Sequence, residues 1–227
     1  MKNLVFFLGL LILLNFSCKT DKNKKTITPA EVEQSIPEKI AYANGFKHWN
    51  KVKKIQFSFN VDRDTAHFER KWIWDIHKNK VTRIITKDTI TYKRNALDSV
   101  STKINGGFIN DKFWLLAPFN LIWDSKNYTY TYSENSKSPI AKEELQKLTI
   151  VYGNEGGYTP GDAYDFYFDT DYKIKEWVYR KANQAEPSMT TTWEDYSLEQ
   201  GMHIAKMHKK GGDNFKLYFT DLEIFTD

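Results

Sequence analysis

Apolar and polar side chains alternate along most of the chain beyond residue 54. Residues 55–61 place Ile, Phe, Phe and Val at every second position, and residues 68–74 place Phe, Arg, Trp and Trp likewise. A period of two predicts a strand with one buried face. The pattern recurs at 81–86, 89–94, 148–152, 163–169, 174–181, 189–196, 202–209 and 215–224. We expect a mainly β (α+β) protein with a few short helices and a large curved antiparallel sheet of about ten or eleven strands.

Helices and loops are predicted where the alternation stops. Thr28-Pro29-Ala30-Glu31 has the cap residue, proline and acid that begin a helix, so a short helix is expected at 30–36. Pro37 ends it, and a second short helix is expected at 38–44, before Gly45. Asn105-Gly106-Gly107 indicates a loop leading into the apolar run 108–116. The other irregular segments are predicted as a short helix or lid-like loop at 118–126, a helical turn at 142–146, and a long glycine-rich loop at 153–162.

The amino terminus has the features of an export signal. After Lys2, residues 4–14 form an uncharged run of 11 residues, too short for a membrane-spanning helix but sufficient for a secretory signal. Cys18, the only cysteine, directly follows Ser17. This arrangement resembles the lipobox of bacterial lipoproteins, which implies a signal peptide at 1–17 and acylation of Cys18. An ordinary signal peptide with a chance cysteine is the alternative.

The excess positive charge lies close to that cysteine. Residues 19–25 hold four lysines and one aspartate, whereas residues 26–227 hold 28 basic and 28 acidic side chains. Because basic groups favour an anionic membrane surface, we expect a lipidated basic tether at 18–27 and a single folded domain at 28–227. A neutral domain argues against nucleic-acid binding. By the same lipoprotein resemblance, Lys19 in place of Asp after the cysteine implies the outer membrane.

No catalytic motif accompanies this layout. The sequence lacks G-x-S-x-G, H-E-x-x-H, G-x-x-x-x-G-K-[ST] and G-x-G-x-x-G, and its five histidines show no metal-ligand spacing. We therefore expect a binding protein with no catalytic residue, no metal and no cofactor, and we place a hydrolase third among the function classes. For the loop 153–162, calcium held by Asn154, Glu155, Asp162 and loop carbonyls is an alternative.

Aromatic residues make up 15% of the chain. Same-facing residues of antiparallel neighbours lie side by side, so the first two strands are expected to form one apolar wall and strand 163–169 a second wall. The expected ligand-contacting residues are Phe57, Phe59, Phe68, Trp72, Trp74, Trp114, Trp123, Phe166 and Phe168. Ordinary core packing of these rings and stacking of exposed rings on a glycan are the two alternatives.

The order of these features resembles the LolA/LolB-type lipoprotein carriers. A lipobox is followed by a short helix ending near Gly45-Phe46, then by Trp49 leading into an aromatic strand, and then by a long antiparallel meander. The resemblance spans residues 38–227. It implies a half-barrel of eleven strands closed by helices, with an apolar pocket for acyl chains.

These observations together predict an outer-membrane-anchored envelope lipoprotein. We expect it to bind a lipid or acyl-type ligand in the periplasm and to contact the membrane through its amino-terminal lipid. A glycan- or protein-binding accessory lipoprotein of an outer-membrane complex, with an outer-membrane protein as its partner, is the alternative.

Overall fold

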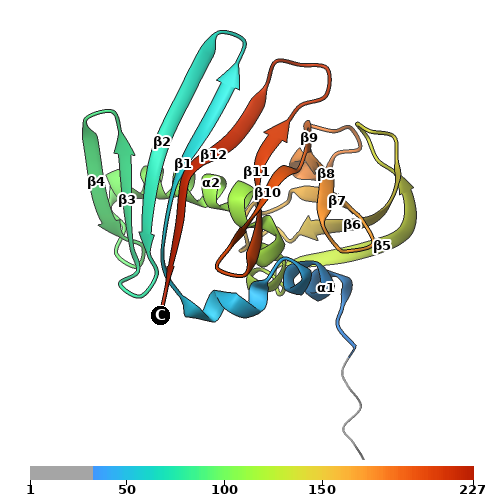
Figure 1. The fold of residues 1–227 in the computed structure, drawn as a ribbon, viewed down its shortest axis with the longest axis horizontal. Helices are drawn as coiled ribbons and strands as arrows, with labels where there is room; N and C mark the ends of the chain where they lie inside the picture. The colour runs from blue at the N-terminus through green and yellow to red at the C-terminus, as the bar shows by residue number, and fades with distance from the viewer. Residues whose placement is uncertain (1–32) are drawn as a thin grey trace, which may run out of the picture. The chain divides into compact units, whose positions relative to one another are not determined.

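Two antiparallel sheets and one long helix dominate the protein, for which a computed structural model describes residues 33–227 (Figure 1). Residues Gln34–Asp227 form one compact unit. The predicted signal peptide, Cys18, the basic tether and residues 30–32 of the predicted helix 30–36 lie outside the described residues. Residues 33–35 are described and are not helical, which contradicts that part of the prediction.

The larger sheet has seven strands in the order β10-β11-β12-β1-β2-β3-β4. Its strands are β1 (Val52–Arg63), β2 (Ala66–Asp75), β3 (Lys80–Ile85), β4 (Asp88–Lys93), β10 (Glu194–Glu199), β11 (Met202–Lys209) and β12 (Lys216–Thr226). The smaller sheet has five strands in sequence order: β5 (Tyr128–Lys137), β6 (Glu144–Tyr152), β7 (Ala163–Phe168), β8 (Ile174–Arg180) and β9 (Met189–Thr192). All neighbouring pairs are antiparallel, which confirms the predicted class of a curved antiparallel half-barrel.

The two sheets meet at Trp193, where one predicted strand is divided into β9 and β10. The Trp193 amide still donates to the Lys175 carbonyl of the smaller sheet at 2.7 Å. On the other side of the junction, His208 Nδ1 in β11 donates to the Thr192 carbonyl at 3.2 Å, and the Lys209 amide donates to the Thr192 hydroxyl at 3.0 Å. The chain therefore crosses from one sheet to the other without leaving the hydrogen-bonded surface.

A 25-residue helix, α2 (Ser99–Trp123), corrects the loop predicted at 105–107 and includes residues 118–123 of the segment predicted as a short helix or lid-like loop. Asp98 caps it by accepting the Ser101 amide at 2.7 Å, and the predicted loop at 105–107 is helical. Pro118 falls inside the helix, whose dihedrals are disturbed at Leu116 (φ −125°, ψ 27°). Residues 113–121 are buried on every side, so tertiary packing outweighs the local glycine and proline signals. Within residues 33–227, no helix combines the length and apolarity that a membrane span requires.

The amino-terminal helices also differ in their limits from the prediction. Helix α1 (Ile36–Ala43) begins two residues earlier than predicted and has a proline in its first turn. Gly45 follows with φ 91°, and a Cβ there would lie 2.3 Å from the Gly201 carbonyl oxygen, so only glycine fits. The 3-10 helix η1 (Phe46–Lys51) then brings Trp49 to the start of β1, while η2 (Lys181–Asn183) follows β8.

The stretch from β5 to β6 contradicts two further expectations. Strand β5 was not predicted, because tyrosine and threonine alternate in it and neither residue type marks a clearly apolar face. In the structure most of these side chains are exposed. The predicted helical turn at 142–146 is wrong, since β6 begins at Glu144. The Glu176 carboxylate organises the connecting turn instead, accepting from the Ser138 hydroxyl and from two backbone amides at 2.7 Å, those of Ile140 and Ala141.

A buried ion pair attaches α2 to the larger sheet. The fully buried Asp111 carboxylate accepts from Arg70 Nε at 2.5 Å, Arg70 Nη2 at 2.6 Å and Trp72 Nε1 at 2.7 Å. Burial raises the pKa of Asp111, and the donors from Arg70, Asn110 and Trp72 oppose that rise. A Cβ at Gly107 would lie 2.9 Å from Arg70 Nη1, so the helix glycine makes room for the guanidinium.

Asp111→Ala is expected to lower the free energy of unfolding by about 3–5 kcal/mol, because it leaves the Arg70 guanidinium and the Trp72 indole N–H without their acceptor. Urea unfolding followed by circular dichroism measures the change. Glu194→Ala, which breaks the exposed pair with Lys209, is the matched control and should cost less than about 1 kcal/mol. Equal effects of the two substitutions would contradict this role for Asp111.

The junction of the sheets is expected to make stability depend on pH. Burial lowers the pKa of His208 to about 3, and its Nε2 has no hydrogen-bond partner among the described residues. Below about pH 6.5 the histidine of the unfolded chain binds a proton, whereas His208 of the folded chain does not. The free energy of unfolding should therefore fall by about 1.4 kcal/mol for each pH unit between about pH 6.5 and about pH 3.

Urea unfolding of His208→Gln tests this expectation. The pH dependence of its unfolding free energy should be shallower than that of the wild type below about pH 6.5, whereas exposed His77→Gln should follow the wild type. Parallel curves for the wild type and His208→Gln would show that the buried imidazole is not the source.

Candidate ligand cavity

A cavity of about 380 Å³ opens between the two sheets, beside α2. The larger sheet contributes residues from the last part of β1 and from the β11–β12 hairpin, and the smaller sheet contributes β7, β8 and the start of β9. The lining residues are Phe59, Val61, Arg63, Asn110, Trp114, Tyr158, Thr159, Tyr164, Trp177, Tyr179, Met189, Phe215 and Leu217. A volume of this size and a mainly apolar, aromatic lining are typical of small-ligand sites.

The tyrosines of the lining have their polar ends bound by the protein. Tyr158 donates from its hydroxyl to Asn110 Oδ1 at 3.1 Å, and Tyr179 donates to Asp162 Oδ2 at 3.0 Å. The Tyr164 hydroxyl lies 2.9 Å from that of Thr159. Burial raises the pKa of all three phenols, that of Tyr179 to about 12. The cavity is therefore bordered by neutral rings whose hydroxyls already have partners.

The loop 153–162 forms one wall of the cavity. The structure confirms that it is irregular between β6 and β7, but Tyr158 in it is well packed. Its ring stacks on Phe113 of α2 with centroids 3.8 Å apart and planes 5° apart. Gly157 has φ 73°, and a Cβ there would lie 2.6 Å from the Tyr152 ring, so glycine lets the loop approach the sheet closely.

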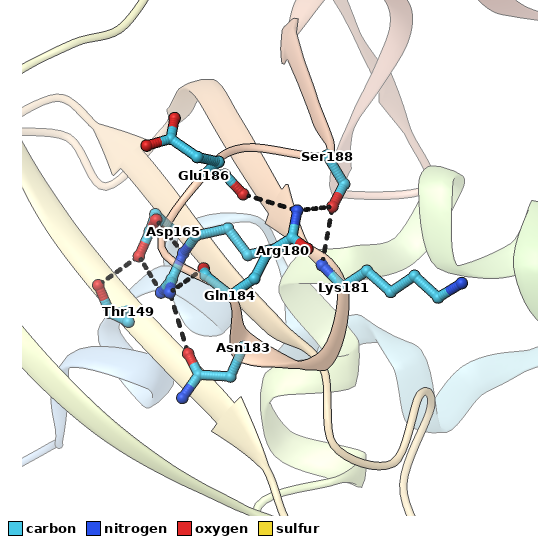
Figure 2. A network of polar contacts seen from close by, with 8 residues as sticks. All are labelled: Thr149, Asp165, Arg180, Lys181, Asn183, Gln184, Glu186 and Ser188. Carbon is cyan, nitrogen blue, oxygen red and sulfur yellow. Dashed lines mark hydrogen bonds and ion pairs between the residues drawn. The ribbon is translucent and has the colours of Figure 1, made fainter.

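A polar network fixes the β8–β9 loop, which precedes the cavity residue Met189. Arg180 pairs with Asp165, its Nε at 3.1 Å from Oδ2, and its Nη1 donates to Asn183 Oδ1 at 2.9 Å and to the Gln184 carbonyl at 3.3 Å. Figure 2 shows these contacts together with Thr149, whose hydroxyl donates to Asp165 at 2.6 Å. Further along the loop, the Ser188 hydroxyl accepts from the Lys181 backbone amide and from Gln184 Nε2. Gln184 Nε2 also donates to the Glu186 carbonyl. The loop that leads to Met189 is thus tied to Arg180 of β8, which pairs with Asp165 of β7.

Arg63 is the one cation of the lining. It ends β1 at the outer limit of the cavity, it is exposed, and its guanidinium carbon lies 5.6 Å from the centroid of the Phe215 ring. Cavity and cation together offer an apolar interior with a positive charge at the entrance.

The structure separates the nine ligand-contacting residues predicted from the sequence into four groups. Phe59 and Trp114 line the cavity. Trp74 and Trp123 line a different pocket, and Phe68 is 43% exposed at the hairpin end of β2. The remaining four are packed in the core, outside the lining of either pocket: Phe57, Trp72, Phe166 and Phe168.

Strand parity predicts the buried face but not which part of that face the helix covers. Phe108 of α2 packs on Trp72 and Trp74 at ring distances of 5.4 and 5.5 Å, so the centre of the sheet is filled. The cavity lies nearer the strand ends. It includes Tyr164, which belongs to the second wall predicted on strand 163–169. Its other lining residues include several that the sequence analysis did not predict as ligand contacts: Tyr158, Trp177, Tyr179, Met189, Phe215 and Leu217. Nearness to a hairpin turn, combined with an aromatic residue of the inward parity, is the signal that would have found Tyr179 and Phe215.

Protein partners bind the carboxylate of Asp162, one of the two considered for calcium, and also that of Asp169 after β7. Asp162 accepts from the Tyr179 hydroxyl and the Ala182 amide. Asp169 accepts from the amides of Asp171 and Lys173 and forms an ion pair with Lys175. Among residues 33–227 there is no group of three or more His, Cys, Asp or Glu side chains arranged to hold a metal ion.

Comparison with known proteins gives similarity at the level of structure. No family model and no curated protein matches the sequence. A LolA superfamily protein from Nitrosomonas europaea is similar over 86% of this chain and 94% of its own, with a TM-score of 0.52 and 12% identity.

Two other solved structures were found. A DUF1329 family protein from Desulfovibrio piger is similar over 85% of this chain and 94% of its own, at 9% identity. An outer membrane lipoprotein-sorting protein domain from Vibrio parahaemolyticus is similar over 83% of this chain and 93% of its own, at 11% identity. Both have a TM-score of 0.45. The curved sheets, the helix against their concave side and the likeness to the Nitrosomonas protein show that this chain has the LolA-like fold.

Proposed function

We propose that the cavity between the two sheets binds the hydrocarbon chain of a lipid or fatty acid. The observation that carries this proposal is a cavity of about 380 Å³ whose walls come from both sheets, α2 and the loop 153–162. Each methylene group moved from water into such a site contributes about 0.8 kcal/mol before the costs of association are subtracted. A chain of several methylenes therefore suits a lining whose polar tyrosine groups already have partners.

Arg63 gives the proposed ligand a direction. A carboxylate or phosphate at the head of the ligand would lie near this guanidinium at the entrance, while the hydrocarbon tail extends towards Trp114 and Trp177. The ligand is then an anionic lipid or a free fatty acid. The protein acts in this proposal by binding, without a catalytic step.

The anchoring part of the proposal rests on the sequence. Cys18 after an 11-residue apolar run supports attachment of diacylglycerol and placement of the domain on the periplasmic side of the outer membrane. The lysines at 19–25 would then lie beside the membrane surface. An anchored domain with an acyl cavity fits a local receptor of lipid at the membrane, with an outer-membrane protein as a partner that receives or delivers it.

Filling the cavity tests the ligand site. Met189→Trp places a larger ring in the lining and should weaken binding of laurate at least about tenfold, because it occupies the space that the chain needs. Calorimetric titration measures the affinity, and the wild type should show the negative heat-capacity change of apolar burial. Leu198→Trp, at a side chain 64% exposed on β10, is the control that should bind as the wild type does. Absence of laurate binding by the wild type, or unchanged binding by Met189→Trp, would contradict the proposal.

Replacement of Cys18 tests the anchor. Because Cys18 is the only thiol, labelled palmitate should enter the wild-type chain and be absent from Cys18→Ala, which should leave the membrane fraction. Fractionation and labelling in a Gram-negative host measure both effects. Label retained by Cys18→Ala would refute acylation at this residue.

A further inference from the structure

A second pocket lies at the opposite end of the β1–β2 hairpin from the proposed acyl cavity. Its volume is about 350 Å³, and it is enclosed by η1, the last part of β2, the segment after β4 and the carboxyl-terminal part of α2. In register, Trp74 of this pocket pairs with Ile55 near the start of β1, whereas Phe59 and Val61 of the acyl cavity lie towards the end of that strand. The lining residues are Trp49, Trp74, Ile76, Arg94, Lys112, Trp123 and Asp124.

Two cations in this pocket, Arg94 and Lys112, form no ion pair with any of the residues that the structure describes. The Arg94 guanidinium carbon lies 5.8 Å from the Trp74 ring centroid and 5.4 Å from that of Phe108, and Arg94 Nε has no hydrogen-bond partner among the described residues. Lys112 Nζ donates to Asn120 Oδ1 at 2.9 Å and lies 4.7 Å from the Trp123 ring centroid. Within residues 33–227, neither cation has a carboxylate within ion-pair distance.

The two charges act on one another across the pocket. Burial and, second, the charge of Arg94 lower the pKa of Lys112 to about 8, while Asp124 opposes the change. Burial also lowers the pKa of Arg94. Charged groups withdrawn from water are normally paired. Contact with an aromatic face replaces only part of the hydration free energy that such a group loses on burial. An anion between the two side chains would supply the missing partner.

The remaining walls suit a hydroxylated ring. Trp49 packs against Trp123 and Trp74 with centroids 4.8 and 5.6 Å apart, which forms an apolar, aromatic surface beside the cations. Asp124 accepts from the Tyr152 hydroxyl through Oδ2 at 3.0 Å, and its other oxygen can accept a hydroxyl from a ligand. We propose that this pocket binds a small anionic sugar, with its carboxylate or phosphate between Arg94 and Lys112 and its ring against the tryptophans.

This site is separate from the acyl cavity, because α2 lies between them. Asn110 and Trp114 of the helix line the acyl cavity, whereas Lys112 and Trp123 line the sugar pocket. The two ligands therefore bind independently, and each can be removed by substitutions that leave the other site intact.

Titration of the full chain with four probes tests the inference: glucuronate, glucose 6-phosphate, neutral glucose and inorganic phosphate. Tryptophan fluorescence should report binding of the sugar carboxylate or the sugar phosphate, since three tryptophans line the pocket. Affinity should fall with ionic strength. It should also fall above about pH 8, where Lys112 loses its proton.

Arg94→Gln and Lys112→Met should each weaken binding of the anionic sugar at least about tenfold while laurate binding remains. Arg63→Gln is the matched control, since it removes a cation from the other cavity and should leave sugar binding unchanged. The inference is overturned if neither anionic sugar binds, if glucose binds as tightly as they do, if phosphate alone matches glucose 6-phosphate, or if both pocket variants bind normally. Because laurate is titrated in parallel, failure of the acyl site is seen separately.

Discussion

The fold depends on the burial of one helix against the concave side of two sheets. Helix α2 has no polar face over residues 113–121, so it is stable only where both sheets and α1 cover it. The carboxylate of Asp111, with Arg70 and Trp72 as donors, fixes the helix position relative to β2. An apolar helix could slide along an apolar wall, but a buried carboxylate with three directed donors accepts one position.

The position of α2 also determines where open space remains. Its aromatic residues fill the middle of the half-barrel, with Phe108 on Trp72 and Phe113 on Tyr158. Space is left towards each end of the β1–β2 hairpin, and the two ends differ in chemistry. One is lined by neutral rings with a single cation at its entrance; the other has two partly buried cations against tryptophans. A single structural constraint thus leaves two pockets of different chemistry.

The sequence predicts the sheets well because strand alternation is a local property. Residues 55–61 and 68–74 show it clearly and form β1 and β2. The prediction fails where tertiary contacts determine the local structure. Gly106 and Pro118 indicate breaks, yet both lie within α2, because burial of the apolar residues of that helix compensates for their poor helix propensity. For the site, inward parity selected Phe59, which lines the cavity, but Phe57 shares that parity and lies in the core. Trp114, which also lines the cavity, lies on α2, where strand parity does not apply. Only the helix position distinguishes a core ring from a cavity wall, and no local pattern encodes it.

The central claim is that hydrocarbon enters between the two sheets, and photo-crosslinking tests it most directly. A fatty acid carrying a diazirine at the end of its chain would be bound to the intact protein, irradiated, and its attachment sites mapped by mass spectrometry. The account predicts label on residues of the cavity, above all Trp114, Trp177 and Met189. Label confined to exposed apolar side chains such as Tyr130, Leu198 and Phe225 would contradict it.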